Sequence, residues 1–205
     1  MGTDDCFMND KSTNETLLLG LKEKIAAGDQ NSFRQLFHIY AQKLTQFAFA
    51  IVKTNDAARE IVDEVFIKIW RNKSSIASIQ NVTVYLYTAV KNTSLNYLSA
   101  RAKENMIESF DFFSVHLSDN NSPEKTLINS ELLKKINAAI DKLPPRCKMV
   151  FKLVREDGLS YKEVGAILKI SPKTVDAQMM IAVKQISEKV KMDFDYFPNR
   201  NIKKN

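Results

Sequence analysis

The sequence predicts an all-α protein made of two small helical domains. Apolar residues recur at steps of three and four along most of the chain, which is the spacing of an amphipathic helix. The 205 residues include only five glycines and five prolines, so few positions interrupt a helix. The helical spacing fails between residues 106 and 123, which divides the chain. A chain of 205 residues also suits two small helical domains better than one. We therefore expect domains at residues 15–104 and 125–192.

The first domain is expected to contain four helices around one core. Residues 1–14 are polar and acidic and are expected to form a flexible, frayed terminus. A first helical pattern follows and stops near Gly28. A second pattern places eight apolar side chains on one stripe between Phe33 and Ile51. The third begins after Thr54-Asn55-Asp56, whose side chains suit a helix N-terminus, and runs to about Arg71.

A polar link over residues 72–81 leads to the fourth helix, which carries apolar residues from Tyr85 to Tyr97 and ends near Lys103. Residues 105–124 are expected to form an acidic linker, because Glu104 to Glu124 holds five acids and no bases. Five apolar side chains lie inside it: Phe110, Phe112, Phe113, Val115 and Leu117. This segment either folds back on one of its own domains or occupies a channel in a partner.

The second domain begins with a helical pattern from Leu127 to Ile140, which Leu143-Pro144-Pro145 stops. Pro145 can open the next helix, because proline is tolerated in a first turn, and Gly158 is a natural C-terminal stop. Ser160-Tyr161-Lys162-Glu163 has the spacing of a capping box. We expect a flexible terminus over residues 193–205.

A short helix, a three-residue turn at residues 169–171 and a longer amphipathic helix predict a helix-turn-helix. Ser171 is placed to cap the second helix and Pro172 to open it. In this motif the second helix enters the major groove of DNA. Its outward side chains are the candidate base and phosphate contacts: Ser171, Pro172, Lys173, Thr174, Asp176, Ala177, Met180 and Lys184. The alternative is an ordinary helical hairpin.

Two faces of the first domain are candidate binding surfaces. On the third helix, paired acids stand beside large aromatic residues, a composition typical of protein docking surfaces: Asp63, Glu64, Phe66 and Trp70. Alternatively, the aromatic rings complete the core while the acids face water. The fourth helix and the link before it interleave donors with an aromatic, which suits single-stranded nucleic acid: Asn81, Lys91, Asn92, Asn96, Tyr97 and Arg101. The alternative there is a solvated helix face.

The charge distribution favours nucleic acid as a partner of the second domain. The net charge is +6, and residues 131–205 alone hold 16 Lys and Arg against 9 Asp and Glu. Cys6 and Cys147 are far apart, so we expect two free thiols and neither a metal nor a cofactor. His38 and His116 share no catalytic constellation, which argues against an enzyme and a small-molecule substrate. No signal peptide or membrane-spanning run is visible, so we expect a cytoplasmic protein.

Together these motifs resemble the extracytoplasmic-function (ECF) sigma factors over about residues 17–190. Residues 57–70 look like the polymerase-binding helix of that family, and residues 85–98 look like its promoter-melting helix. Leu143-Pro144-Pro145-Arg146, Gly158 to Val164 and Ser171 to Val175 look like its C-terminal domain. The resemblance implies a four-helix sigma domain two, a linker that runs through the RNA-exit region of the polymerase, and a sigma domain four.

The resemblance also implies partners and roles. Asp63, Glu64, Phe66 and Trp70 would meet core RNA polymerase. The link and the fourth helix would open the minus-ten promoter element and hold an extruded base, and the helix from Pro172 would read the minus-thirty-five element. Family members are usually held inactive by an anti-sigma factor, so one is expected here, and through it an indirect link to a membrane.

This chain departs from the family pattern at four positions. Asp63 stands where many members have Gln, and Asp176 where a base is common. Gly165 replaces Ala and permits close packing, and Lys169 replaces the usual turn Gly, which predicts strain. Two rival functions remain open: an operator-binding regulator that works without polymerase, and a helical adaptor that binds only protein.

Overall fold

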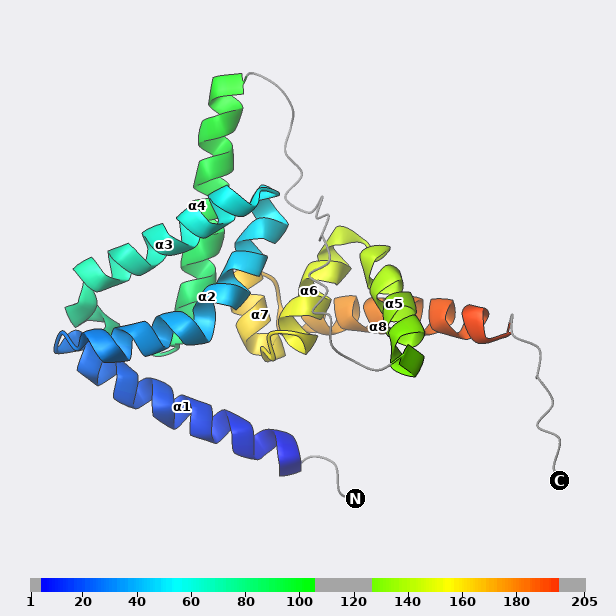
Figure 1. Ribbon diagram of the computed structural model, residues 1–205, viewed down its shortest axis with the longest axis horizontal. Coiled ribbons are helices and arrows are strands. Elements are labelled where there is room, and N and C mark those ends of the chain that lie inside the picture. The colour runs from blue at the N-terminus through cyan, green and yellow to red at the C-terminus, as the bar shows by residue number, and fades with distance from the viewer. Residues whose placement is uncertain (1–4, 106–126, 196–205) are drawn as a thin grey trace. The chain divides into compact units, whose positions relative to one another are not determined.

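The computed structural model describes residues 5–105 and 127–195, and it describes side-chain surroundings for residues 16–102 and 134–189. These residues are helical and contain no strand, which confirms the all-α prediction. The chain divides near residue 109 into two compact units (Figure 1). The predicted linker lies outside the described residues except for Asn105, and so does the end of the chain after Asp195.

The N-terminal unit has four α-helices and one short 3₁₀ helix among its described residues. They are α1 (Asp5–Ala26), α2 (Gln30–Val52), α3 (Asn55–Arg71), η1 (Lys73–Ser78) and α4 (Val82–Asn105). Helix α1 begins inside the polar segment for which we expected a frayed terminus. No glycine or proline stands between residues 5 and 14, so no side chain there prevents a helix from continuing.

Helix α2 is at the centre of this unit, where it packs against α1, α3 and α4. Its buried stripe includes Leu36, Leu44 and Ile51, each at most 1% exposed. Asp29 caps the helix, since its carboxylate accepts hydrogen bonds from the backbone N–H groups of Asn31 at 3.2 Å and Ser32 at 3.0 Å. Hydrogen bonds from Ser32 lower the pKa of the Asp29 carboxyl.

The junction between α2 and α3 differs from the predicted cap. Thr54 has an extended backbone, but its side chain makes no capping hydrogen bond. Instead, Lys53 ends α2 in the left-handed region with φ of 65°, and its backbone N–H donates to the carbonyl of Phe49. The turn is therefore fixed by a left-handed residue rather than by the hydroxyl of Thr54.

The C-terminal unit is built around its last helix. It contains α5 (Leu127–Asp141), α6 (Pro145–Arg155), α7 (Tyr161–Leu168) and α8 (Pro172–Asp195), and α8 packs against the other three. Ile140, Leu143, Cys147 and Ala182 form a buried apolar cluster. The Cys147 thiol donates to the Gln178 amide oxygen at 2.9 Å and so joins α6 to α8, and burial raises the pKa of this thiol.

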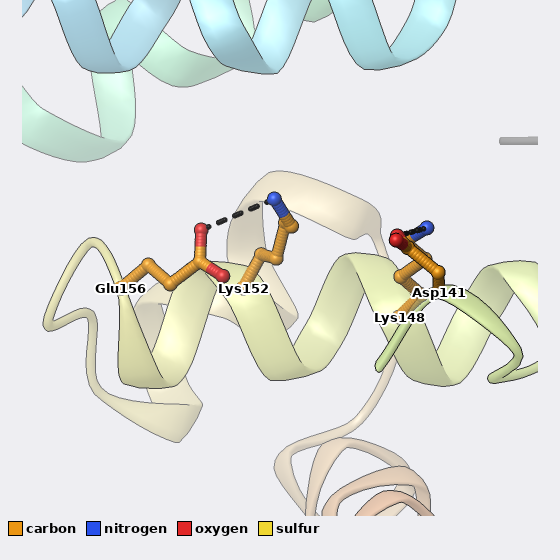
Figure 2. Close-up of polar contacts among 4 residues, drawn as sticks. All are labelled: Asp141, Lys148, Lys152 and Glu156. Atoms are coloured by element: carbon orange, nitrogen blue, oxygen red, sulfur yellow. Dashed lines mark hydrogen bonds and ion pairs between the residues drawn. The ribbon is translucent and has the colours of Figure 1, made fainter. Parts of the chain in front are cut away.

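One lysine of α6 is part of the interior. Lys148 is 2% exposed, and its ammonium lies 2.6 Å from a carboxylate oxygen of Asp141 at the end of α5. Figure 2 shows this pair beside the more exposed pair Lys152–Glu156, whose charged atoms lie 3.3 Å apart at the C-terminal end of α6. A buried charge is costly unless it is paired, and Asp141 supplies the partner that joins the end of α5 to α6.

The predicted capping box at the start of α7 is confirmed: the backbone N–H of Ser160 donates to the Glu163 carboxylate at 2.8 Å, and that of Glu163 to the Ser160 hydroxyl at 3.3 Å.

The turn between α7 and α8 is tight. Lys169 has φ of 56°, which confirms the predicted strain at this non-glycine residue. A Cβ on Gly165 would lie 2.8 Å from the Ile170 carbonyl oxygen, so the close approach requires glycine.

Candidate functional site

Helix α8 presents a continuous face to solvent. All eight side chains that the sequence nominated for DNA contact are exposed there: Ser171, Pro172, Lys173, Thr174, Asp176, Ala177, Met180 and Lys184. The opposite side is buried through Val175, Met179 and Ala182, each at most 3% exposed. Val183, next to Ala182 in the chain, is 46% exposed, which widens the outward face.

The N-terminal end of this face suits an anion. Ser171 caps α8, since its hydroxyl accepts from the Thr174 backbone N–H at 3.0 Å. Lys173 lies in the first turn, where the helix dipole also favours negative charge. Asp176 is the one acid among the nominated residues, and Lys184 lies 3.9 Å from Glu188 one turn further along. The face therefore combines groups of the kind that can bind phosphate with apolar side chains of the kind that can meet base edges.

The four residues of α3 nominated for protein docking differ in their exposure to solvent. Asp63 and Glu64 are exposed, and Glu64 forms an ion pair with Lys68. Phe66 is only 3% exposed and packs edge-on against Phe37 with ring centroids 4.9 Å apart, so the prediction of a direct contact is corrected. The physical reason is that α3 packs against α2, and the adjacent residues Val65 and Phe66 are both buried.

Trp70 has an intermediate position on the same helix. It is partly exposed and packs on Phe33 with ring centroids 4.9 Å apart. The Lys73 ammonium lies 5.3 Å from the centroid of the indole. Trp70 therefore contributes to the core on one side and to the surface on the other.

The structure adds one residue to this face that the sequence analysis did not nominate. Ile67 is 51% exposed in the middle of an open surface on α3. The charged side chains around it have both signs: Asp56, Arg59, Glu60, Asp63, Glu64, Lys68 and Arg71. An apolar side chain ringed by charges is the usual composition of a docking surface. The signal was present in the sequence, because Ile67 falls outside the buried stripe of α3.

The residues of α4 nominated for DNA contact also differ in their exposure to solvent. Asn92, Asn96 and Arg101 are exposed, and the Arg101 guanidinium donates to the partly exposed Tyr97 hydroxyl at 3.4 Å. Lys91 is 4% exposed, so the prediction that it meets DNA is corrected. Lys91 is buried because α4 packs against both α2 and α3, which leaves a narrower open face than the sequence suggested.

The predicted polar link is an ordered segment, which we call the connecting segment, residues 72–81. It contains η1, and hydroxyls stabilise it from within: Ser75 donates to the Asn72 carbonyl at 2.7 Å and Ser78 to the Ser75 carbonyl at 2.8 Å. Asn81 caps α4, since its side-chain oxygen accepts from the Val84 backbone N–H at 2.8 Å. Asn81 is exposed, as predicted, but it also has this structural role.

Comparison with known proteins identifies both units. Residues 36–104 match Sigma-70 region 2, and residues 133–186 match Sigma-70, region 4. The ECF RNA polymerase sigma-E factor of Escherichia coli strain K12 is 30% identical over 190 residues, covering 89% of this chain and 97% of that protein. The chain belongs to the ECF sigma factors. Its sigma region 2 therefore spans most of α2 to α4, and its sigma region 4 begins within α5 and ends within α8.

One further relative agrees with this family assignment, and two solved structures have the same fold. The ECF sigma-E factor of Haemophilus influenzae is 29% identical, covering 83% of this chain and 93% of that protein. CnrH, solved with the cytosolic domain of CnrY, has the same fold with a TM-score of 0.55 and 18% identity, over 86% of this chain and 99% of CnrH. The sigma factor RpoE from Bartonella quintana, solved with the anti-sigma factor NepR, also has this fold, with a TM-score of 0.54 and 20% identity. The match covers 78% of this chain and 98% of RpoE.

The described part of this sigma factor contains no helix that is long and apolar enough to cross a membrane. Within the same residues, no group of three or more His, Cys, Asp or Glu side chains could hold a metal ion. The candidate sites are three exposed surfaces: the outward face of α8, the open face of α3, and the connecting segment with α4.

Proposed function

We propose that this ECF sigma factor, which directs RNA polymerase to promoters, divides the task among three surfaces. The open face of α3 binds core RNA polymerase. The connecting segment and the exposed face of α4 contact the opened minus-ten element, and the outward face of α8 reads the minus-thirty-five element as duplex. The observation that carries the proposal is the presence of both Sigma-70 regions in one chain, with these faces exposed on them.

The α3 assignment is supported by exposure and charge. Asp63 and Glu64 are open to solvent beside the exposed Ile67, so an apolar anchor is surrounded by groups that can pair with a partner. The buried Phe66 packs against α2 and so helps to hold α3, the helix that carries Asp63, Glu64 and Ile67, in place. Polymerase recognition on this surface therefore depends on the two acids and on Ile67 rather than on the aromatic rings.

The α4 assignment is supported by groups that suit an unpaired strand. Tyr97 offers a partly exposed ring for stacking, and Arg101, which donates to its hydroxyl, offers a cation for phosphate. Asn92 and Asn96 add amide groups on the exposed side of the helix. Holding an extruded base requires such exposed groups, and Lys91 is not among them.

Two promoter contacts in one chain need not be tight individually. Once one domain has bound, tethering gives the second contact a high effective concentration. Recognition of both elements then depends on the whole chain bound to polymerase rather than on isolated affinity for DNA.

An anti-sigma factor is the second proposed partner. The related RpoE was solved with the anti-sigma factor NepR. In this chain, large apolar side chains are exposed on α8, namely Met180, Ile181 and Val183 at 67%, 41% and 46%. A protein that covered them would also block the reading face. Adding such a partner to the purified sigma factor should abolish both transcription and duplex binding.

The test of the main proposal is run-off transcription by core RNA polymerase on a template library, with and without this protein. Specific initiation only in its presence is the expected result, and the initiated templates reveal both promoter elements. Tight duplex binding without polymerase binding would favour an operator-binding regulator instead. Polymerase binding with no promoter effect would favour a protein-only adaptor.

A further inference from the structure

A buried lysine on α1 holds the connecting segment. Lys22 is 7% exposed, and its ammonium donates a hydrogen bond to the backbone carbonyl of Ile79, 57 positions along the chain. Lysine is rarely buried to this extent unless its charge has a partner. The long side chain therefore has a defined position and joins the first helix to the segment that precedes α4.

The connecting segment is fixed at three places by three kinds of contact. Near its start, the Lys73 ammonium lies over the Trp70 ring. In the middle, the Ile76 side chain is 1% exposed. Near its end, the Ile79 carbonyl accepts from Lys22. The other side chains of the segment are exposed: Asn72, Ser74, Ser75, Ala77, Ser78, Gln80 and Asn81.

The contact at Ile79 differs from the other two because it holds the backbone itself. A hydrogen bond from a charged donor is stronger than one between neutral groups. It is made one residue before Gln80 and two before Asn81, whose side chain caps α4. Loss of the ammonium would leave the Ile76 and Lys73 contacts in place but remove the bond from α1 to the backbone beside these exposed amide side chains.

We propose that Lys22 is a positioning residue for minus-ten recognition. It holds the end of the connecting segment so that Gln80 and its neighbours meet the displaced DNA strand in one geometry. The inference rests on the proposed role of this segment in the sigma factor. Lys22 itself is buried and does not touch DNA, so it acts through the backbone of Ile79.

The test compares full-length Lys22→Met with the unaltered protein in run-off transcription by core polymerase. The templates are a promoter found in the library experiment and its single-base variants in both elements. Methionine keeps an unbranched apolar stem but lacks the donor. We expect discrimination at one or two minus-ten positions to fall about tenfold, the scale of one lost hydrogen bond to a charged group. Discrimination at the minus-thirty-five element should be unchanged.

Two variants and one measurement control the experiment. Lys24→Met removes the same charge from an exposed position on the same helix and should leave both profiles unchanged. Lys22→Arg keeps a cationic donor and should restore minus-ten discrimination. Thermal unfolding and polymerase titration of Lys22→Met establish that the protein is folded and bound at the assay temperature.

The outcomes are separable. An unchanged minus-ten profile in folded Lys22→Met would overturn the inference while the sigma function stands. Equal loss of discrimination at both elements would also overturn it, since that is the result of a general loss of structure. If the unaltered protein supports no initiation, the proposed function fails before Lys22 is tested. If Lys22→Met does not fold, failure of Lys22→Arg to preserve the profile would count against the proposal.

Discussion

Helices α4 and α8 each contain 24 residues, but their neighbours cover them differently. On α8 the buried side chains Val175, Met179 and Ala182 follow one stripe. On α4 adjacent residues are buried, such as Leu86 with Tyr87 and Val90 with Lys91, so its buried surface is wider than one stripe. A helix covered along one stripe can be a reading surface by itself. A helix covered along two must share the binding surface with neighbouring elements.

This difference separates the two regions that we propose bind DNA. The C-terminal unit displays its nominated contacts on one helix, and all of them are exposed. The N-terminal unit assembles its surface from α4 and the connecting segment, and that segment depends on contacts from α1 and α3. Substitutions far from the surface should therefore alter DNA recognition in the N-terminal unit more readily than in the C-terminal unit.

The largest expected effect is a loss of stability when a buried side chain beneath the open face of α3 is removed. Phe66→Ala should destabilise the protein by ~3–5 kcal/mol, because it removes a buried ring that packs against Phe33 and Phe37. Chemical denaturation followed by circular dichroism measures this change. Ile67→Ala, one residue away and half exposed, should cost less than about 0.5 kcal/mol. Full stability of Phe66→Ala with lost polymerase binding would return Phe66 to the docking surface.

The next effect removes the docking surface without touching the core. Changing Asp63→Lys and Glu64→Lys together should weaken core-polymerase binding at least about tenfold. The reason is that two negative charges proposed to pair with the polymerase become positive charges. Folding should be unaffected, since both side chains are exposed. Glu23→Lys on the exposed side of α1 is the control and should bind normally. Unchanged affinity of the double variant in a titration would exclude this surface.

A smaller effect is expected on the reading face of α8. Lys173→Ala should lower DNA affinity several-fold and reduce the salt slope of log K by about 0.9, the contribution of one phosphate contact. Binding isotherms at four or more salt concentrations measure both. Lys189→Ala, further along the same helix, serves as the matched control. An unaltered slope for Lys173→Ala would remove it from the phosphate contacts.

The glycines of the two units should respond with opposite signs. Gly165→Ala should destabilise the C-terminal unit by about 1 kcal/mol, because overlap with the Ile170 carbonyl outweighs the gain in helix propensity. Gly20→Ala in α1 should stabilise by ~0.5–1 kcal/mol, since no atom lies within 4 Å of the added methyl group. Thermal unfolding of both variants checks the signs, and stabilisation by Gly165→Ala would show that the turn relaxes.

The last prediction concerns the two left-handed lysines, and the change at Lys53 is expected to have the smallest effect. Lys169→Gly should stabilise by ~0.5–1 kcal/mol, because glycine adopts φ of 56° without strain. Lys53→Gly should gain less, since its ammonium donates to the Ala50 carbonyl at 2.9 Å and this bond would be lost. The difference in melting temperature between the two variants is the measurement. Equal gains would mean that the side-chain bond of Lys53 contributes nothing.

The sequence alone predicted the local features of this protein. The capping box at Ser160, the strain at Lys169 and the exposure of the α8 face depend on residues within a few positions of one another. Such features are encoded by side-chain chemistry and by the helical period. The same is true of Ile67, which the period of α3 placed outward although the sequence analysis did not nominate it.

The tertiary structure decided which nominated side chains are buried and what holds the connecting segment. Phe66 and Lys91 lie on helices that pack against other helices, and their burial depends on neighbours that no local pattern specifies. The bond from Lys22 to Ile79 joins positions 57 residues apart. Helical periodicity reports one buried stripe per helix, so a second covered face and a contact of this range appear only once the helices are assembled.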